Sequence, residues 1–314
     1  MKGALPLSND LVHEAAHHRA LAGEAIAFGP PYPADRFDDR GIVICASGLR
    51  YFVCAWICVR MLQRLGCNLP IEFWALGNHD WTPEMERLAR EELGVGDCRL
   101  PRVEDRARFT DAWAESAGKA GWELKPYSII ESRFREVLLL DADIVPVVDP
   151  TFLFDSPQLA EHGAIFWPDP TLVGPERAAW EIMGVPYRDE VTLNSGQLLV
   201  DKARCWQALQ LVLHYNAHSD FYFRHLHGDQ DTFYFAWRKL GQSYAMPPFP
   251  VELLPYTFGE PDFIGRRIFQ HRLRKWRFTQ ENVSIPGFLY EEECREALNE
   301  LREKWTHGFP MPAV

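Results

Sequence analysis

Short apolar runs alternate with longer amphipathic segments through the first half of the chain. The apolar runs are rich in β-branched and aromatic residues, as buried strands are, and they occupy residues 41–47, 69–77 and 136–143. The segments between them have helical spacing, and they occupy residues 49–66, 81–94 and 122–134. Thr82 is the expected N-cap of the second helix, with Pro83 in its first turn and Gly94 beyond its end. This alternation predicts an α/β fold with a mostly parallel sheet flanked by helices.

The second half of the chain has longer helical segments. We expect strands at residues 164–168 and 192–201, and helices at residues 202–218, 229–241 and 291–305. The sequence contains no internal repeat, low-complexity segment or flexible linker, so we expect a single domain over residues 41–314. Residues 1–40 include the Pro-rich, charged stretch FGPPYPADRFDDR and are predicted to be an N-terminal extension.

The composition narrows the class of protein. The 314 residues are 47% hydrophobic, which is enough for a substantial core. The formal net charge of −11 argues against nucleic acid or an anionic membrane surface as a partner. The seven cysteines form no CxxC pair, so Cys54 and Cys58 are expected to be buried, reduced thiols. We find no signal-peptide pattern and no transmembrane run, and we expect a cytoplasmic protein of undetermined oligomeric state.

Two aspartates follow directly after the apolar run at residues 136–140. Asp141 and Asp143, separated by Ala142, stand where ligands bind in parallel α/β sheets, beyond the carboxyl ends of the strands. Two buried carboxylates repel each other unless a cation lies between them, and oxygen ligands suit Mg²⁺ or Mn²⁺ bound to a diphosphate. The alternative is a pair of loop aspartates that caps the turn before Pro146.

The surrounding sequence resembles a known family. GWELKPYSIIESRFREVLLLDADIVPVVDPTFLF (residues 121–154) resembles the core of nucleotide-sugar glycosyltransferases with the GT-A fold, and most of all the fungal Golgi α-mannosyltransferases of glycosyltransferase family 71. More distantly, it is similar to family 8, which includes glycogenin and the lipopolysaccharide galactosyltransferases. Residues 41–77 fit the opening block of the same family. The resemblance implies a single GT-A domain, with a nucleotide and metal half at 41–155 and an acceptor half at 156–314.

The resemblance also implies a donor site. Ser47, Gly48 and Tyr51 match the position that holds the nucleotide base, although Tyr51 could instead be a core aromatic. Lys125 matches a basic residue that faces the donor phosphates, and its alternative is a solvated lysine. Together with the aspartate pair, the implied donor-binding residues are Ser47, Gly48, Tyr51, Lys125, Asp141, Ala142, Asp143 and Gly196.

Two further motifs match the region around the reacting sugar. In LNSGQLLVD, Asn194 would face the sugar or acceptor and Gly196 would let a ligand approach the backbone; a strand bulge is the alternative. In HGDQDTFYFAW, Asp229, Gln230 and Asp231 stand at a helix start, where one carboxylate, most simply Asp229, could be the N-cap. Asn194 and these three residues are the expected catalytic group.

A late histidine matches the third metal ligand of the family. His271, in IFQHRLRKW, would complete a site with the two aspartates, and imidazole favours Mn²⁺ over Ca²⁺. Arg272, Arg274 and Lys275 beside it could close over the diphosphate, or form a solvated basic face.

These residues imply a metal-dependent transferase with a nucleotide-sugar donor and a carbohydrate, glycoconjugate or small-molecule hydroxyl acceptor. Family 71 suggests GDP-mannose as the donor, and family 8 suggests a UDP-hexose. Family resemblance points to retention of configuration, for which the Gln230 amide could face the developing positive charge. One alternative is a haloacid-dehalogenase-type phosphatase, because LLLDADIV fits its DxDx[TV] pattern, although that motif normally opens its domain. The other is a catalytically silent sugar-nucleotide-binding module.

Overall fold

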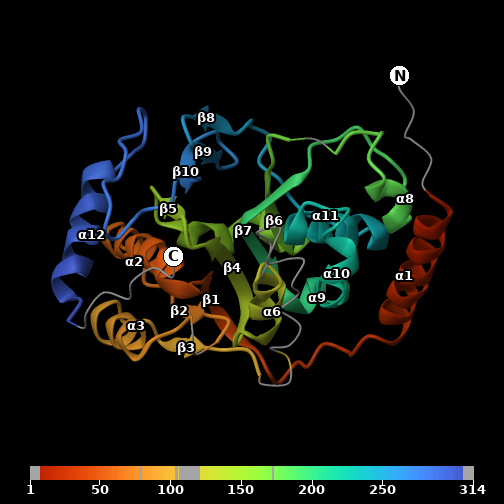
Figure 1. Ribbon diagram of the computed structural model, residues 1–314, viewed down its shortest axis with the longest axis horizontal. Coiled ribbons are helices and arrows are strands. Elements are labelled where there is room, and N and C mark those ends of the chain that lie inside the picture. The colour runs from red at the N-terminus through yellow and green to blue at the C-terminus, as the bar shows by residue number, and fades with distance from the viewer. Residues whose placement is uncertain (1–7, 78–79, 103–104, 106–120, 172, 307–314) are drawn as a thin grey trace.

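A six-stranded mixed sheet forms the centre of the protein (Figure 1). The computed structural model describes residues 8–77, 80–102, 105, 121–171 and 173–306. In spatial order the strands are β3 (Asp97–Arg99), β2 (Ile71–Trp74), β1 (Asp38–Cys45), β4 (Phe134–Asp141), β7 (Leu193–Asp201) and β6 (Ala164–Pro168). The first four are parallel to one another, whereas β7 is antiparallel to both of its neighbours. The predicted α/β fold with a mostly parallel sheet is confirmed.

Strand β4 is the central element that positions the site. Its residues Val137 to Leu140 are fully buried, as expected for a strand covered on both faces. Asp141 pairs in register with Cys45, the last residue of the parallel strand β1. On the other side, Leu140 pairs with Gln197, so the first residues of antiparallel β7 lie at the same sheet edge. The edge therefore collects side chains from three strands.

Helices cover both faces of this sheet. On one face lie α2 (Gly48–Arg64), α3 (Pro83–Arg87), the π-helix η1 (Leu88–Glu92), the 3-10 helix η3 (Pro150–Asp155), α7 (Pro157–His162) and α12 (Glu291–Lys304). On the other lie α1 (Asn9–Phe28), α6 (Leu124–Glu131), α8 (Ala179–Met183), α9 (Lys202–Ala217), α10 (Ser219–Tyr222) and α11 (Gly228–Leu240). Residues of β1 alternate between the two cores, because successive side chains of a strand point to opposite faces. None of the helices in these described parts is both long and apolar enough to cross a membrane.

A second, antiparallel sheet was not predicted from the sequence. It contains β5 (Ile144–Pro146), β10 (Arg267–Arg272), β9 (Thr257–Pro261) and β8 (Glu252–Leu254) in that order. Strand β5 follows directly after the two aspartates, and β10 pairs with it so that His271 lies opposite Ile144. This pairing brings a residue far away in the chain next to the carboxyl end of β4.

Two predicted regions differ in detail from the structure. The extension contains the 20-residue helix α1, which packs on α9. Ser8 is its N-cap, and Ser8 Oγ accepts from Leu11 N at 3.3 Å. The helix expected at 81–94 begins as predicted, because Thr82 Oγ1 accepts from Met85 N at 3.2 Å, but it continues as a π-helix.

Candidate active site

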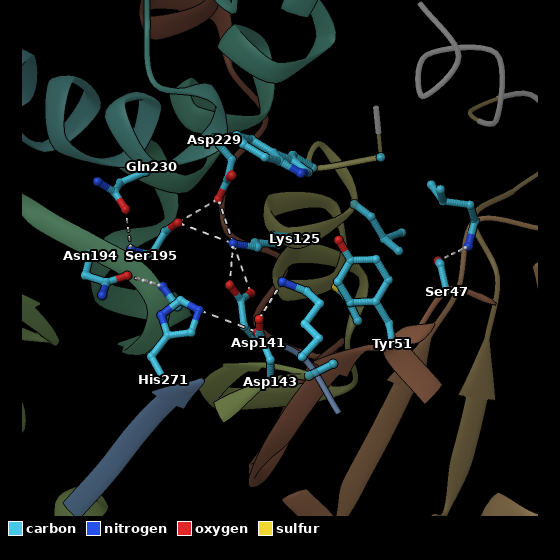
Figure 2. A pocket seen from close by; sticks show the side chains of 18 of the residues that line it. Ser47, Tyr51, Lys125, Asp141, Asp143, Asn194, Ser195, Asp229, Gln230 and His271 are labelled. Carbon is cyan, nitrogen blue, oxygen red and sulfur yellow. Dashed lines mark hydrogen bonds and ion pairs between the residues drawn. The ribbon is translucent and has the colours of Figure 1, made fainter. Parts of the chain in front are cut away.

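A cavity of about 260 Å³ opens at the sheet edge where β1 and β4 end and β7 begins (Figure 2). Residues from both sheets and from three helices face it. Of the residues predicted from the sequence, those that line the cavity are Ser47, Tyr51, Lys125, Asp141, Ala142, Asp143, Asn194, Gly196, Asp229, Gln230, His271 and Lys275. The fold thus brings together segments that lie up to about 220 residues apart in the chain.

Each of the two aspartates has a lysine as its neighbour. Lys125 Nζ lies 2.9 Å from Asp141 Oδ1, and Lys275 Nζ lies 2.7 Å from Asp143 Oδ2. His271 Nε2 approaches the other oxygen of Asp143 at 3.5 Å. The aspartate pair is therefore held in a compact group of opposite charges, which offsets the repulsion between the carboxylates.

Burial and charge shift the pKa values of this group in different directions. Burial raises the pKa of Asp141, although Lys125 lies beside it. Burial also opposes ionisation of Asp143, but His271 and Lys275 outweigh it and hold the pKa of Asp143 below its ordinary value. The same contact with Asp143 raises the pKa of His271 in spite of its burial. Two interacting carboxylates whose pKa values move apart are typical of functional sites.

The donor set fits a divalent metal ion. Asp141, Asp143 and His271 each offer one ligand atom, and these atoms lie within 4.8 Å of one another. Nε2 of His271 faces the aspartate pair, 3.5 Å from Asp143 Oδ1, so this nitrogen is the one that would bind the ion. Two carboxylate oxygens and one imidazole nitrogen suit Mn²⁺ or Mg²⁺.

The opposite wall is a network of fixed polar groups. Ser195 Oγ donates to Asp229 Oδ2 at 2.9 Å, and Lys125 Nζ lies 3.3 Å from the same oxygen. Gln230 Oε1 accepts from Ser195 N at 3.3 Å, while its Nε2 donates to Asp169 Oδ2 at 2.9 Å. Lys125 therefore links the aspartate pair to this wall, as the dashed lines in Figure 2 show.

The side-chain amide of Asn194 is hydrogen-bonded at both ends. Its Nδ2 donates to the buried Glu260 Oε1 at 3.0 Å, and its Oδ1 accepts from Gly196 N at 2.8 Å. Burial raises the pKa of Glu260 to about 7. Glu260 and the Gly196 backbone thus fix the orientation of the Asn194 amide.

Two of the predicted donor-binding and catalytic residues, Gly48 and Asp231, lie outside the cavity lining. Asp231 Oδ2 accepts a hydrogen bond from His227 N at 2.8 Å. The carboxylate that binds the backbone at the start of α11 is therefore that of Asp231 and not that of Asp229. Gly48 begins α2, and its N donates to Asp80 O at 2.7 Å.

The three basic residues that follow His271 in the chain have different surroundings in the structure. The guanidinium of Arg272 is buried 4.0 Å from the Trp276 ring, and that of Arg274 lies 3.9 Å from the Tyr256 ring. Only Lys275 of the three lines the cavity.

Sequence reasoning missed seven of the lining residues: Cys45, Leu76, Gly121, Trp122, Leu124, Ser195 and His227. Among them, Ser195, Trp122 and His227 stand within the motifs described above, at most three residues from one that was singled out, so motif position was the available signal.

Comparison with known proteins adds the decisive observation. The model of a mannosyltransferase family matches residues 39–190 and 188–257, most of the chain. This chain belongs to the mannosyltransferase family. The resemblance drawn from the sequence is therefore confirmed, and the phosphatase alternative loses its support. The match ends before β10, so His271 and Lys275 lie outside the matched residues.

Individual members of the mannosyltransferase family are distant relatives. Alpha-1,2-mannosyltransferase MNN21 of Candida albicans is 24% identical in an alignment that covers 74% of this chain and 43% of that protein. Alpha-1,2-mannosyltransferase MNN5 of Saccharomyces cerevisiae is 22% identical in an alignment that covers 80% of this chain and 52% of that protein. The chain thus spans about half the length of these curated relatives.

Two solved structures with a similar fold are those of glycosyltransferases. The galactosyltransferase LgtC, in complex with donor and acceptor sugar analogs, matches with a TM-score of 0.49 and 18% identity, covering 86% of this chain and 98% of that chain. The mannosyltransferase Ktr4p of S. cerevisiae matches with a TM-score of 0.45 and 10% identity, covering 75% and 78%.

Proposed function

We propose that this protein is a metal-dependent, retaining glycosyltransferase that moves a hexose from a nucleotide-diphosphate sugar to a hydroxyl group. GDP-mannose is the first donor to test, because the family is one of mannosyltransferases and the relatives above are named alpha-1,2-mannosyltransferases. A UDP-hexose is the second. The observation that carries the proposal is the meeting of the Asp141, Asp143 and His271 cluster with the Lys125 and Asp229 wall in one cavity.

The residues divide into two roles. Asp141, Asp143 and His271 would hold the metal ion, for which Mn²⁺ suits the mixed donor set. When bound, the ion supplies positive charge that stabilises the leaving diphosphate. Lys125 adds a second positive charge within 3.4 Å of Asp141, Ser195 and Asp229, and so fixes the orientation of the wall beside the reacting sugar.

The interactions of the lining carboxylates and of Gln230 favour retention of configuration. Asp229 is engaged by Ser195 and Lys125, and the other two lining aspartates belong to the metal cluster, so no lining carboxylate among the described residues is free to act as a base. Ser195 N and Asp169 hold the Gln230 amide at both ends, which preorganises its dipole for positive charge on the sugar. Asp229 is placed to position donor hydroxyls or the acceptor.

Donor turnover tests this proposal directly. With Mn²⁺ and GDP-mannose, we expect slow release of mannose and GDP, loss of this release with a chelator, and an α-linked product once a hydroxyl acceptor is added. The anomeric coupling constant in the NMR spectrum of the product identifies the linkage, and a β-linkage would contradict retention. Release of inorganic phosphate from generic esters would support a phosphatase, and donor binding without turnover would support a binding module.

A further inference from the structure

An aromatic wall closes the cavity at the start of α11. Trp122 and His227 both line the cavity, and their ring centroids lie 6.2 Å apart at an interplanar angle of 55°. Trp122 stands three residues before Lys125, and His227 two residues before Asp229. The wall is therefore connected on both sides to residues of the proposed reaction site.

The backbone of Gly228 holds the indole in place. A Cβ atom at Gly228 would lie 2.1 Å from Cε3 and 2.4 Å from Cζ3 of Trp122, so the ring packs directly against bare backbone. Gly228 also has φ of +59°, a conformation that residues with a side chain rarely adopt. The Asp231 carboxylate fixes the same turn by accepting from His227 N at 2.8 Å. A half-buried indole that is held this firmly is preorganised for contact with a ligand.

The order of groups along the cavity assigns this wall to the acceptor. Figure 2 shows Ser47 and Tyr51 at one end, the aspartate pair and Lys125 in the middle, and Gln230 and Asn194 at the other end. A nucleotide-diphosphate sugar that has its base at the first end and its diphosphate at the aspartates has its sugar beside Asp229 and Gln230. The Trp122 and His227 wall, which Asp229 follows in the chain, has no part in holding the donor in this arrangement and is left for the second substrate.

We propose that Trp122 is a stacking platform for a pyranose acceptor, with His227 beside it to meet acceptor hydroxyls. The inference rests on the proposed function and narrows it, because it selects a carbohydrate from the possible acceptor classes. The apolar C–H face of a pyranose covers an aromatic ring well, while polar groups at the rim set its orientation. Asp229, which follows the platform in the chain, is positioned to face a hydroxyl of the stacked sugar.

Kinetics of Trp122→Ala separate this role from a structural one. We expect the KM for methyl α-mannoside to rise on the order of tenfold, the size of one aromatic contact. Acceptor-independent hydrolysis of the donor and the KM for the donor stay within about twofold, since the donor does not touch the platform. Trp122→Phe keeps a flat ring and is expected to restore most of the acceptor affinity. Phe28→Ala, which removes an exposed ring on α1, is the control and leaves both steps unchanged.

Two results would overturn the platform. One is an unchanged acceptor KM in Trp122→Ala, and the other is a parallel fall of hydrolysis, transfer and melting temperature, which marks a purely structural residue. Saturation-transfer NMR with methyl α-mannoside is independent of turnover: we expect the C–H face of the sugar to be saturated by the wild type and not by Trp122→Ala. If sugar binding follows this pattern while no nucleotide sugar is hydrolysed, the proposed reaction fails and the platform stands. If no saturation is seen with an active enzyme, the platform fails alone.

Discussion

At position 196, neighbouring side chains leave room only for a glycine. A Cβ atom there would lie 2.8 Å from Nδ1 and 3.0 Å from Cε1 of His271, and 3.1 Å from Asn194 Oδ1. From the sequence, this glycine was expected to let a ligand approach the backbone. In the structure, the group that approaches is the imidazole of His271. A glycine is needed so that this ring can reach Asp143.

Substitution of this glycine tests the geometry of the cluster. In Gly196→Ala, the added methyl group displaces the His271 ring from Asp143, and we expect Mn²⁺ affinity to fall by about an order of magnitude, as for the loss of support to a ligand. Isothermal titration with Mn²⁺ measures this. Gly23→Ala is the matched control, because a Cβ on Gly23 meets nothing within 4 Å. Identical titrations for Gly196→Ala and the wild type would remove His271 from the metal cluster.

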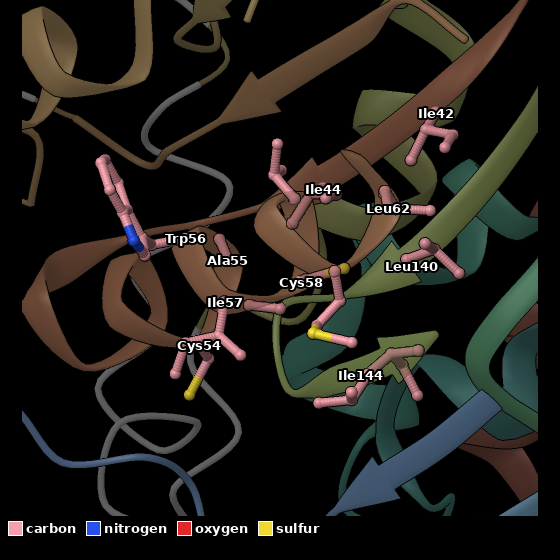
Figure 3. Packing of buried hydrophobic residues seen from close by; sticks show 14 of the residues in the cluster. Ile42, Ile44, Cys54, Ala55, Trp56, Ile57, Cys58, Leu62, Leu140 and Ile144 are labelled. Carbon is pink, nitrogen blue, oxygen red and sulfur yellow. The ribbon is translucent and has the colours of Figure 1, made fainter. Parts of the chain in front are cut away.

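Among the described helices, α2 has the largest number of buried residues. Ten of its 17 residues are buried, and it lies between the sheet and α12, where Trp56 Nε1 donates to Ala297 O at 2.8 Å. Figure 3 shows Cys54 and Cys58 among the aliphatic side chains of this core. Both thiols are free, and burial raises the pKa of Cys54 to about 12. The predicted role of these cysteines as buried, reduced thiols is confirmed.

Helix α1 is attached through a group of histidines. The ring of His18 stacks on Phe221 of α10 with centroids 3.9 Å apart, and it makes an edge contact with His218 at 5.5 Å. His214 of α9 lies 4.6 Å from His218. Burial, with His218 and His18 nearby, lowers the pKa of His214 to about 4. The other charged or titratable groups that influence His18 are His17, Glu14 and Asp220.

This group predicts acid sensitivity. Between about pH 6.5 and pH 4 the unfolded chain binds a proton at His214 that the folded chain does not, so stability falls as pH falls through this window. Urea unfolding at pH 7.5 and pH 5 should show a smaller loss of stability for His214→Gln than for the wild type. His13→Gln, on the exposed side of α1, should behave as the wild type does. Equal losses in all three proteins would show that His214 does not cause the pH dependence.

At the level of the whole molecule, the two sheets meet at the aspartate pair. Asp141 ends β4 of the large sheet, Asp143 immediately precedes β5 of the small sheet, and β10 contributes His271 through its pairing with β5. The backbone joins β10 to this turn as well, since Arg272 N donates to Asp143 O at 3.0 Å. A ligand that binds all three side chains therefore links the two sheets.

Metal binding should consequently stabilise the entire fold. At 100-fold excess over the dissociation constant, an ion that binds only the folded chain contributes about 2.7 kcal/mol, and the melting temperature rises by a few degrees. In Asp143→Asn the effect of Mn²⁺ should disappear. The control Asp155→Asn changes an exposed aspartate that pairs with Arg40, and it should keep the shift. A shift of equal size in Asp143→Asn would contradict the assignment of Asp143 as a ligand.

Local sequence was sufficient for five of the six strands of the main sheet, for most of the longer helices and for the position of Asp141 and Asp143; the short edge strand β3 was not predicted. Hydrophobic periodicity and end signals are properties of neighbouring residues, so the strand before the aspartates and the helix that begins at Thr82 could be read directly. Motif resemblance added most of the residues that line the cavity. His271 was also predicted in this way, although periodicity gave no sign of the strand that carries it.

Only the tertiary structure decided which groups meet. The pairing of β5 with β10, the lysine beside each aspartate, the choice of Asp231 over Asp229 at the helix start, and the packing of Trp122 on Gly228 all join residues that local patterns do not connect. Helix α1 was missed for the same reason, because its partners Phe221 and His218 are some 200 residues away. Such contacts depend on the relative position of whole elements, which is fixed by packing and burial across the molecule and not by the spacing of residues along the chain.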